Sequence, residues 1–197
     1  MEPVRAISGV VAPLDRADVD TDQIIPKQFL RRIERTGFGP FLFFDWRKDP
    51  DFVLNRPEYA SASVLLAGPN FGCGSSREHA AWALQQAGYR AVVAPSFGDI
   101  FRNNCHKIGL LPVRVPEARV RQLLEIASEA PETEVVIDLE TQTVSGPGFD
   151  AGFEIDAFVK QRLLNGWDDI GLALRHEEAI QAFESTRPAW LPTVGAR

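Results

Sequence analysis

The chain has 197 residues, of which 45% are hydrophobic and 24% are charged. This length suits one domain with extensions, and the composition is typical of soluble globular proteins rather than disordered chains. The formal net charge of −6 excludes the basic surface of a nucleic-acid-binding protein. Because no apolar run approaches the ~18 residues that span a bilayer and residues 1–5 show no secretory signal, we expect a cytoplasmic protein without a membrane partner.

The two cysteines, Cys73 and Cys105, do not form a CxxC pair. A chain of this length builds a core without disulfides, so we expect free thiols in a reducing compartment. The three histidines lack the HxxxH or HExxH spacing of a metal site. No metal ligand is predicted in this chain.

The first third of the chain predicts one strand followed by irregular connections. Residues 4–12 are apolar enough for a strand, and the four aspartates of residues 15–22 indicate a loop rather than a calcium site. Pro26 suits the first turn of a short helix over residues 27–30. Three arginines then precede a glycine-containing loop at residues 36–40, either as a solvated face or as a grip for an anion: Arg31, Arg32 and Arg35.

Strands and helices alternate clearly between residues 63 and 115. Apolar runs predict buried strands at residues 63–67, 91–94 and 110–115. Helices are predicted between them at residues 75–87 and 98–107, closed by Gly88 and Gly109. This alternation is typical of right-handed crossovers in a parallel sheet, so the sequence predicts an α/β fold.

The last part of the chain predicts further elements of the same domain. They are a helix at residues 116–130, a hairpin at 134–139 and 142–145, a short strand at 152–155, and helices at 157–165 and 177–185. Residues 187–197 are expected to be an irregular tail. Since no repeat or linker divides the chain, residues 1–197 are predicted to form a single domain.

A glycine-rich loop at residues 68–74 leads into the sequence Ser75-Ser76-Arg77-Glu78. This sequence has the form of a capping box, in which the Ser75 hydroxyl accepts a hydrogen bond from the Glu78 amide. Glycines allow a ligand to approach the backbone, and a helix start favours an anion. Arg77 in the first turn would oppose the helix dipole, which suggests that it holds a ligand.

The composition of this loop favours carboxylate recognition over nucleotide binding. No lysine follows Gly74 as in a phosphate-binding loop, and the third glycine of a dinucleotide fingerprint is missing. The serine hydroxyls could donate to an oxyanion or act as a base. A Cys73 nucleophile with His79 or His106 as base is the weaker alternative, because free cysteines most often pack as small hydrophobic residues.

Residues 70–81 (Asn-Phe-Gly-Cys-Gly-Ser-Ser-Arg-Glu-His-Ala-Ala) resemble the swivelling domain of the aconitase superfamily. Within the superfamily, the chain is similar to the small-subunit family of the isopropylmalate dehydratases, which act in leucine biosynthesis. Three further stretches carry this resemblance, at residues 20–27, 35–39 and 96–101, the last ahead of Gly-Leu-Leu-Pro-Val at residues 109–113. It extends from about Val10 to about Pro188.

The resemblance implies a swivelling β/β/α domain with a largely parallel central sheet flanked by helices. Such a domain caps a large subunit, which carries a 4Fe-4S cluster through its own cysteines, and the enzyme is active only as this heterodimer. The reaction removes water from 2-isopropylmalate and adds it back to 2-isopropylmaleate to give 3-isopropylmalate. The cluster acts as a Lewis acid on the substrate hydroxyl and carboxylate.

The resemblance also assigns roles to residues of this chain. Ser75 takes the position of the general base with Ser76 beside it, and Arg77 pairs with a carboxylate of the dicarboxylate substrate. Gly74 lies in the substrate-binding loop, and the specificity loop contributes Arg35 and Thr36. Phe38 or Leu30 could meet the isopropyl group. Because Ser75 cannot be both cap and base, Ser76 or the backbone would share the capping.

Two other classes of function stay open at this point. One is the small subunit of a homoaconitase or of a citraconate or methylmalate hydratase, since an apolar pocket separates related acids only weakly. An arginine that points inward from the loop at residues 35–39 would favour the homoaconitase. The other is a non-catalytic binding module, which would have no need of the paired hydroxyls of Ser75 and Ser76.

Overall fold

The structure is a computed structural model that describes residues 1–31, 34–188 and 190. Seven strands form one sheet: β1 (Ala6–Leu14), β2 (Val64–Ala67), β3 (Ala91–Ala94), β4 (Leu111–Arg114), β5 (Glu134–Asp138), β6 (Thr143–Gly146) and β7 (Phe149–Gly152). The α-helices are α1 (Thr21–Ile24), α2 (Glu78–Gln86), α3 (Asp99–Ile108), α4 (Glu117–Glu129), α5 (Ala157–Leu164), α6 (Asp169–Leu174) and α7 (Glu177–Ser185). The predicted short helix after Pro26 is a 3-10 helix, Lys27–Arg31, and four more 3-10 turns follow: Gly39–Phe41, Trp46–Lys48, Val53–Asn55 and Pro57–Tyr59.

The sheet has the strand order β4-β3-β2-β1-β5-β6-β7 and changes direction at β1. The later part of β1 pairs in parallel with β2, with Val11 opposite Val64, and the pairs β2–β3 and β3–β4 are also parallel. The earlier part of β1 pairs with β5 in antiparallel fashion, and the hairpin strands β6 and β7 continue that half. The predicted α/β fold with parallel crossovers is confirmed, and it carries an antiparallel extension.

Two apolar cores lie on the two faces of the parallel strands. Leu65 and Ala67 of β2 pack with the cluster that includes α2 and α3, whereas Val64 and Leu66 pack with the cluster that includes α4. All four residues of β2 and all four of β3 are buried. Burial on both faces explains why these strands are continuous apolar runs in the sequence rather than alternating patterns.

The C-terminal half departs from the sequence prediction in two places. The predicted strand at residues 152–155 is wrong, because β7 is Phe149–Gly152. A tight turn at residues 147–148, with Gly148 at φ +67°, reverses the chain directly after β6 and starts β7 earlier. Helix α6 was not predicted; the Asp168 side chain caps it by accepting a hydrogen bond from the amide of Gly171. Most of the predicted tail, residues 189 and 191–197, and Arg32 lie outside the described residues.

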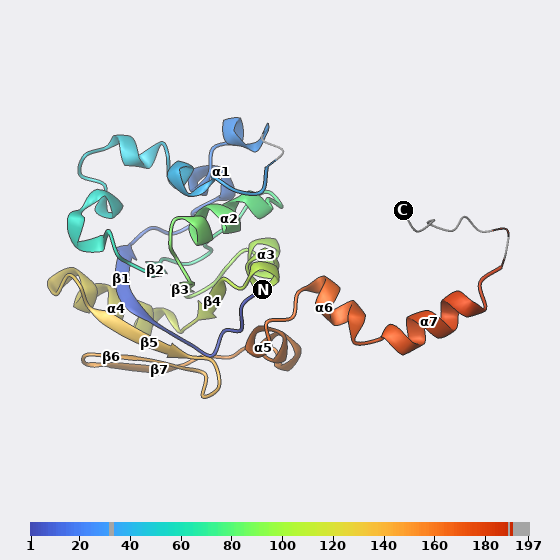
Figure 1. The fold of residues 1–197 in the computed structure, drawn as a ribbon. Helices are drawn as coiled ribbons and strands as arrows, with labels where there is room; N and C mark the ends of the chain where they lie inside the picture. Colours follow the sequence, from blue (N-terminus) through green and yellow to red (C-terminus); the bar gives the residue numbers. More distant parts are fainter. Residues whose placement is uncertain (32–33, 189, 191–197) are drawn as a thin grey trace.

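Helices α6 and α7 extend away from the body of the domain, whereas α1 to α5 lie against it (Figure 1). None of the helices among the described residues has the length and apolar character needed to cross a membrane.

The loop after β2 packs tightly against α3 through Gly72. Gly72 has a φ of +74°, and a Cβ atom at this position would lie 2.2 Å from the ring of Phe101. The rings of Phe101 and Phe71 meet edge to face with centroids 5.4 Å apart, which fixes Phe101 from the other side. The loop therefore needs a residue that has no side chain at this point.

We expect Gly72→Ala to lower the free energy of unfolding by about 2–5 kcal/mol, since it combines backbone strain with a clash in the core. The measurement is urea unfolding monitored by circular dichroism. Gly148→Ala is the matched control: its φ is also positive, but no atom lies within 4 Å of the added Cβ, so a loss of about 1 kcal/mol is expected. Equal losses in the two variants would contradict the packing argument.

Candidate functional site

Three loops meet at the carboxyl ends of β1, β2 and β3. The amide of Gly72 donates to the carbonyl of Val19 at 2.7 Å, and the amide of Thr21 donates to the carbonyl of Cys73 at 3.0 Å. On the other side, the amide of Gly98 donates to the carbonyl of Phe71 at 2.9 Å. Because parallel neighbouring strands end at the same edge of a sheet, loops far apart in the sequence can bond in this way. The glycine-rich loop is thus held between the loops that follow β1 and β3.

The predicted capping box at Ser75 is wrong. Helix α2 begins at Glu78, its N-cap is Arg77, and no side chain caps it. The backbone of Ser75 is engaged instead: its carbonyl accepts hydrogen bonds from the Thr21 hydroxyl at 3.2 Å and from the Arg77 amide at 2.9 Å. Residues 75–77 therefore form a turn before the helix, and the uncapped start of α2 can offer its amides to an anion.

The side chains of Ser75 and Ser76 are exposed on this turn. Within the part of the chain that the structure describes, neither hydroxyl has a hydrogen-bond partner. Gly74, just before them, has a φ of +91° and is exposed as well. The loop thus presents two hydroxyl groups and an open backbone to whatever binds at this edge.

Arg77 is ion-paired with Asp22 of α1. The Arg77 side chain is 21% exposed and that of Asp22 is 49% exposed, so the pair lies at the rim of the site. A capping box does occur nearby, at the start of α1. The Asp20 carboxylate accepts a hydrogen bond from the Gln23 backbone amide, and the Gln23 side-chain oxygen accepts one from the Asp20 backbone amide. Arg77 was predicted in the first helical turn but is the N-cap of α2, and no sequence pattern indicated Asp22, because only the tertiary fold brings α1 against α2.

The segment from Arg35 to Phe38 is fastened to the end of α2 by one side chain. The Gln86 amide accepts a hydrogen bond from the Phe38 amide and donates one to the Arg35 carbonyl, each at 2.8 Å. The Arg35 guanidinium lies 5.9 Å from the ring centroid of Trp82, and Thr36 is exposed. Arg35 and Thr36 therefore lie along the flank of α2, whereas Gly74, Ser75, Ser76 and Arg77 lie at its start.

Phe38 is not available to a ligand in this structure. Its ring is fully buried and lies 5.1 Å from His79 and 5.8 Å from Trp82, measured between ring centroids. Phe38, one of the two residues predicted to contact an apolar ligand group, is therefore a core residue in this structure. Leu30, the other, is half-buried and packs against the same core.

Neither cysteine has the environment of a catalytic nucleophile. Burial raises the pKa of the Cys73 thiol, and the nearby carboxylates of Asp20 and Asp18 raise it further. Cys105 is enclosed in the core, where burial raises its pKa strongly, and burial lowers the pKa of His106 to about 4. A catalytic cysteine needs the opposite shift, toward the thiolate. Across the described residues, no three His, Cys, Asp or Glu side chains gather as a metal site.

Comparison with known proteins relates this site to a family. The family described as "Aconitase C-terminal domain" matches residues 1–118, which include all three loops. Residues 169–196 match the C-terminal domain of the 3-isopropylmalate dehydratase small subunit. The 3-isopropylmalate dehydratase small subunit of Rubrobacter xylanophilus is 62% identical over 98% of this chain and 100% of its own length. This chain belongs to the 3-isopropylmalate dehydratase small-subunit family.

Two further proteins match this chain over nearly its whole length. The 3-isopropylmalate dehydratase small subunit of Frankia alni is 56% identical over 98% of this chain and 99% of its own. The crystal structure of a 3-isopropylmalate dehydratase from Methanocaldococcus jannaschii superposes with a TM-score of 0.65 at 27% identity, covering 91% of this chain and 99% of that one. The fold of the dehydratase small subunit is thereby confirmed for this chain.

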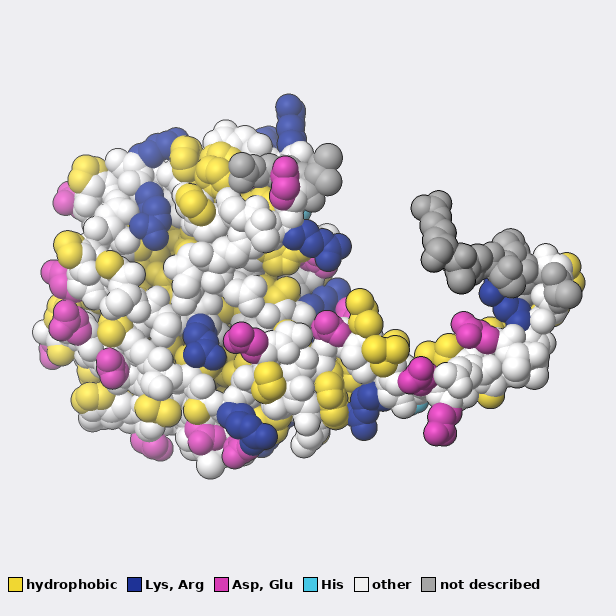
Figure 2. Space-filling model, viewed as in Figure 1, with side chains coloured by type: hydrophobic (Ala, Val, Ile, Leu, Met, Phe, Trp, Pro, Cys, Tyr) yellow, Lys and Arg dark blue, Asp and Glu magenta, His cyan; other side chains and the backbone are white. Residues whose placement is uncertain are grey.

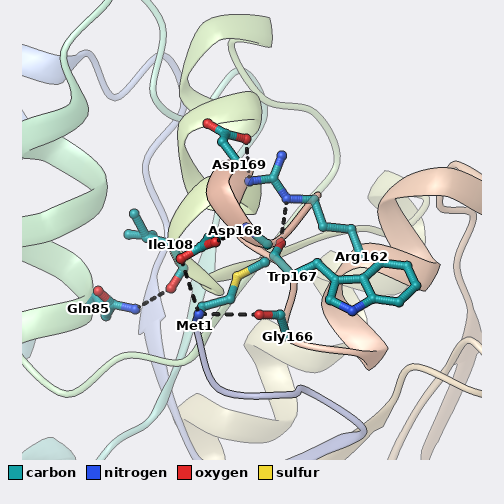
Figure 3. Close-up of polar contacts among 9 residues, drawn as sticks. Met1, Gln85, Ile108, Arg162, Gly166, Trp167, Asp168 and Asp169 are labelled. Carbon is teal, nitrogen blue, oxygen red and sulfur yellow. Dashed lines mark hydrogen bonds and ion pairs between the residues drawn. The ribbon is translucent and has the colours of Figure 1, made fainter. Parts of the chain in front are cut away.

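We expect Gln86→Leu to release the segment at residues 35–38 from α2. The variant loses both bonds of the Gln86 side chain, and loss of the one that the Phe38 amide donates should speed exchange of that amide hydrogen by about 3- to 10-fold, since a typical bond contributes about 1 kcal/mol. Hydrogen exchange followed by NMR measures this. Gln85→Leu is the control, because the Gln85 side chain donates to the Ile108 carbonyl of α3 at 2.7 Å (Figure 3) and should leave Phe38 unchanged. Unaltered exchange in Gln86→Leu would show that the segment is held by other contacts.

Proposed function

We propose that this chain supplies the proton-handling and carboxylate-binding side of a dehydratase active site and is active only with the large subunit bound. As a member of its family, it is a 3-isopropylmalate dehydratase small subunit of leucine biosynthesis, converting 2-isopropylmalate to 3-isopropylmalate through 2-isopropylmaleate. The observation that carries the proposal is the exposed, unpartnered hydroxyl pair of Ser75 and Ser76 beside Arg77.

In this proposal, Ser75 is the general base. As the alkoxide, it takes the proton from the carbon next to a substrate carboxylate, while the hydroxyl group leaves as water with a proton donated from the large-subunit side. The Ser75 hydroxyl then returns its proton to the other carbon when water adds with the opposite regiochemistry, and the water gives its second proton back to the large-subunit side. A serine alcohol is a poor base at neutral pH, so its alkoxide must be stabilised. The uncapped amides of α2 and the Arg77 guanidinium can do this once a partner excludes water from the turn.

Arg77 and the neighbouring loops bind the substrate in this scheme. The guanidinium can hold a carboxylate through two parallel hydrogen bonds, and Asp22 keeps it oriented before the substrate arrives. Gly74 lets the ligand approach the backbone. Arg35 and Thr36 contribute from the segment that Gln86 holds, and there Arg35 lies over Trp82. Nothing in that orientation favours the third carboxylate of a homoaconitase substrate, so we propose a dicarboxylate.

We place a 4Fe-4S cluster on the large subunit, where it supplies Lewis-acid chemistry toward the substrate hydroxyl. The cysteines of this chain do not fit such a group, because Cys105 is enclosed in the core and Cys73 is half-buried beside two aspartates. Both are free thiols, which is compatible with the cytoplasm as the proposed compartment. We further propose that residues 1–197 act together as one swivelling domain.

The first test is hydration of 2-isopropylmaleate, followed by loss of its absorbance under anaerobic conditions. We expect no turnover by the chain alone and turnover when the cluster-bearing large subunit from the same source is added. Activity of the chain alone would contradict the proposed dependence on that subunit. If the assembled pair hydrates citraconate or homoaconitate but not isopropylmaleate, the substrate assignment is wrong.

The second test removes the proposed base. We expect Ser75→Ala to lower kcat of the assembled enzyme by at least about 100-fold, the lower end for loss of a general base, while binding of the large subunit stays unchanged. Ser128→Ala, at an exposed serine on α4, is the matched control and should keep full activity. Near-normal turnover by Ser75→Ala would exclude Ser75 as the base.

A further inference from the structure

The part of the chain that carries α6 and α7, residues 166–188, exposes apolar side chains along its length. We call it the C-terminal arm. Ile170 and Leu174 lie four residues apart on α6 and are 71% and 60% exposed; Ile180 and Phe183 lie three residues apart on α7 and are 40% and 70% exposed. Residues three or four apart share one face of a helix, so each helix presents an apolar stripe. Figure 2 shows hydrophobic side chains along the arm and open space between it and the body of the domain.

The two helices of the arm are too short to be stable without a covering surface. Helix α6 has six residues and α7 has nine, whereas isolated helices below about 12–15 residues are marginal in water. Two shallow hollows lie on the arm. One is lined by Phe158, Leu172 and Arg175 among others, and the second includes Ile180, Phe183 and Arg187. Stripes and hollows of this kind are typical of a surface that another protein covers.

The direction in which the arm leaves the domain is fixed at its root (Figure 3). The Arg162 side chain of α5 is 11% exposed and pairs with the Asp169 carboxylate at 2.8 Å, while its Nε donates to the Trp167 carbonyl at 3.0 Å. The amino group of Met1 donates to the Gly166 carbonyl at 3.2 Å. These contacts tie the first turn of α6 to α5 and to the segment that leads into β1. They fix the direction in which the arm leaves the domain.

The family matches indicate which protein covers the arm. Residues 1–118, which hold the site, match the aconitase C-terminal domain. By its name, that domain is the end of a longer chain. The match does not reach the arm. The arm falls in a separate match, to the C-terminal domain of dehydratase small subunits. A domain that is a separate chain has to hold its large subunit through surface contacts. The arm is apolar surface that lies outside the aconitase-type match.

We propose that the C-terminal arm is a docking element for the large subunit. This inference rests on the proposed function, since it takes the large subunit as the partner. The apolar stripes of α6 and α7 would lie in a hydrophobic groove of that subunit. Because Glu177 and Glu184 border the stripe on α7, basic side chains are expected at the rim of the groove.

The test compares two variants of the full chain for binding to the large subunit. The double variant Ile170→Gln, Phe183→Gln removes one exposed apolar side chain from each helix and keeps good helix formers. Val136→Gln, at a 44% exposed residue of β5 outside the arm, is the matched control. Sedimentation measures assembly as mass, and the turnover assay is run separately with saturating large subunit.

We expect Kd for the large subunit to rise by about 10- to 100-fold in the double variant and to stay unchanged in Val136→Gln. Circular dichroism should show the melting of the body unaltered, and kcat at saturation should be normal, because the Ser75 loop is intact.

Wild-type affinity in the double variant would overturn the inference. So would a change confined to self-association, which would make a second copy the occupant. If the wild-type pair assembles but has no turnover, the proposed function fails and the docking inference stands.

Discussion

Parallel pairing of β1, β2 and β3 determines where the site can form. Three strands that run in the same direction end at one edge, and the loops that follow them become neighbours although the first and the last are about 80 residues apart in the chain. The loops then bond to one another through backbone groups, as between Gly72 and Val19 and between Gly98 and Phe71. These backbone bonds, with the Asn70 side chain that donates to the Asp18 carboxylate at 2.8 Å, hold the glycine-rich loop in place without using the two serine hydroxyls. The hydroxyls of Ser75 and Ser76 are thereby left for a ligand.

The charges of the site follow from the same arrangement. Contact between Thr21 and the Ser75 carbonyl brings α1 against the start of α2, and Asp22 then meets Arg77. The guanidinium is oriented by a carboxylate that is half exposed, so a substrate carboxylate can compete for it. The cysteine in the same loop is kept neutral by burial and by the acids beside it. The groups that this edge offers to a ligand are therefore hydroxyls, amides and a guanidinium rather than a thiolate.

The alternating unit at residues 63–115 could be predicted from the sequence because local and global signals agree there. Buried parallel strands are continuous apolar runs, and Gly109 ends α3 in the left-handed conformation as predicted. The glycine-rich loop was also predicted, and the assignment of Ser75, Ser76 and Arg77 as the site stays a prediction. The capping box predicted at Ser75 is wrong, because α2 begins at Glu78 and the Ser75 carbonyl instead accepts bonds from the Thr21 hydroxyl and the Arg77 amide. Asp22 and the Gln86 contacts depend on segments about 50 residues away, and no local pattern indicates them.

The position of β1 between the two halves of the sheet has a consequence for the order of folding. Its later residues can pair once β2 has been made, but its earlier residues wait for β5, about 125 positions further along the chain. Closure of such a long loop is slow, and the free edge of β1 is exposed until it happens. During synthesis, the edge with the candidate site can assemble from the first 114 residues, while the other side of β1 stays open to incorrect pairing. Strands β5, β6 and β7 thus cover the free edge of β1 late in folding, after the parallel half of the sheet has formed.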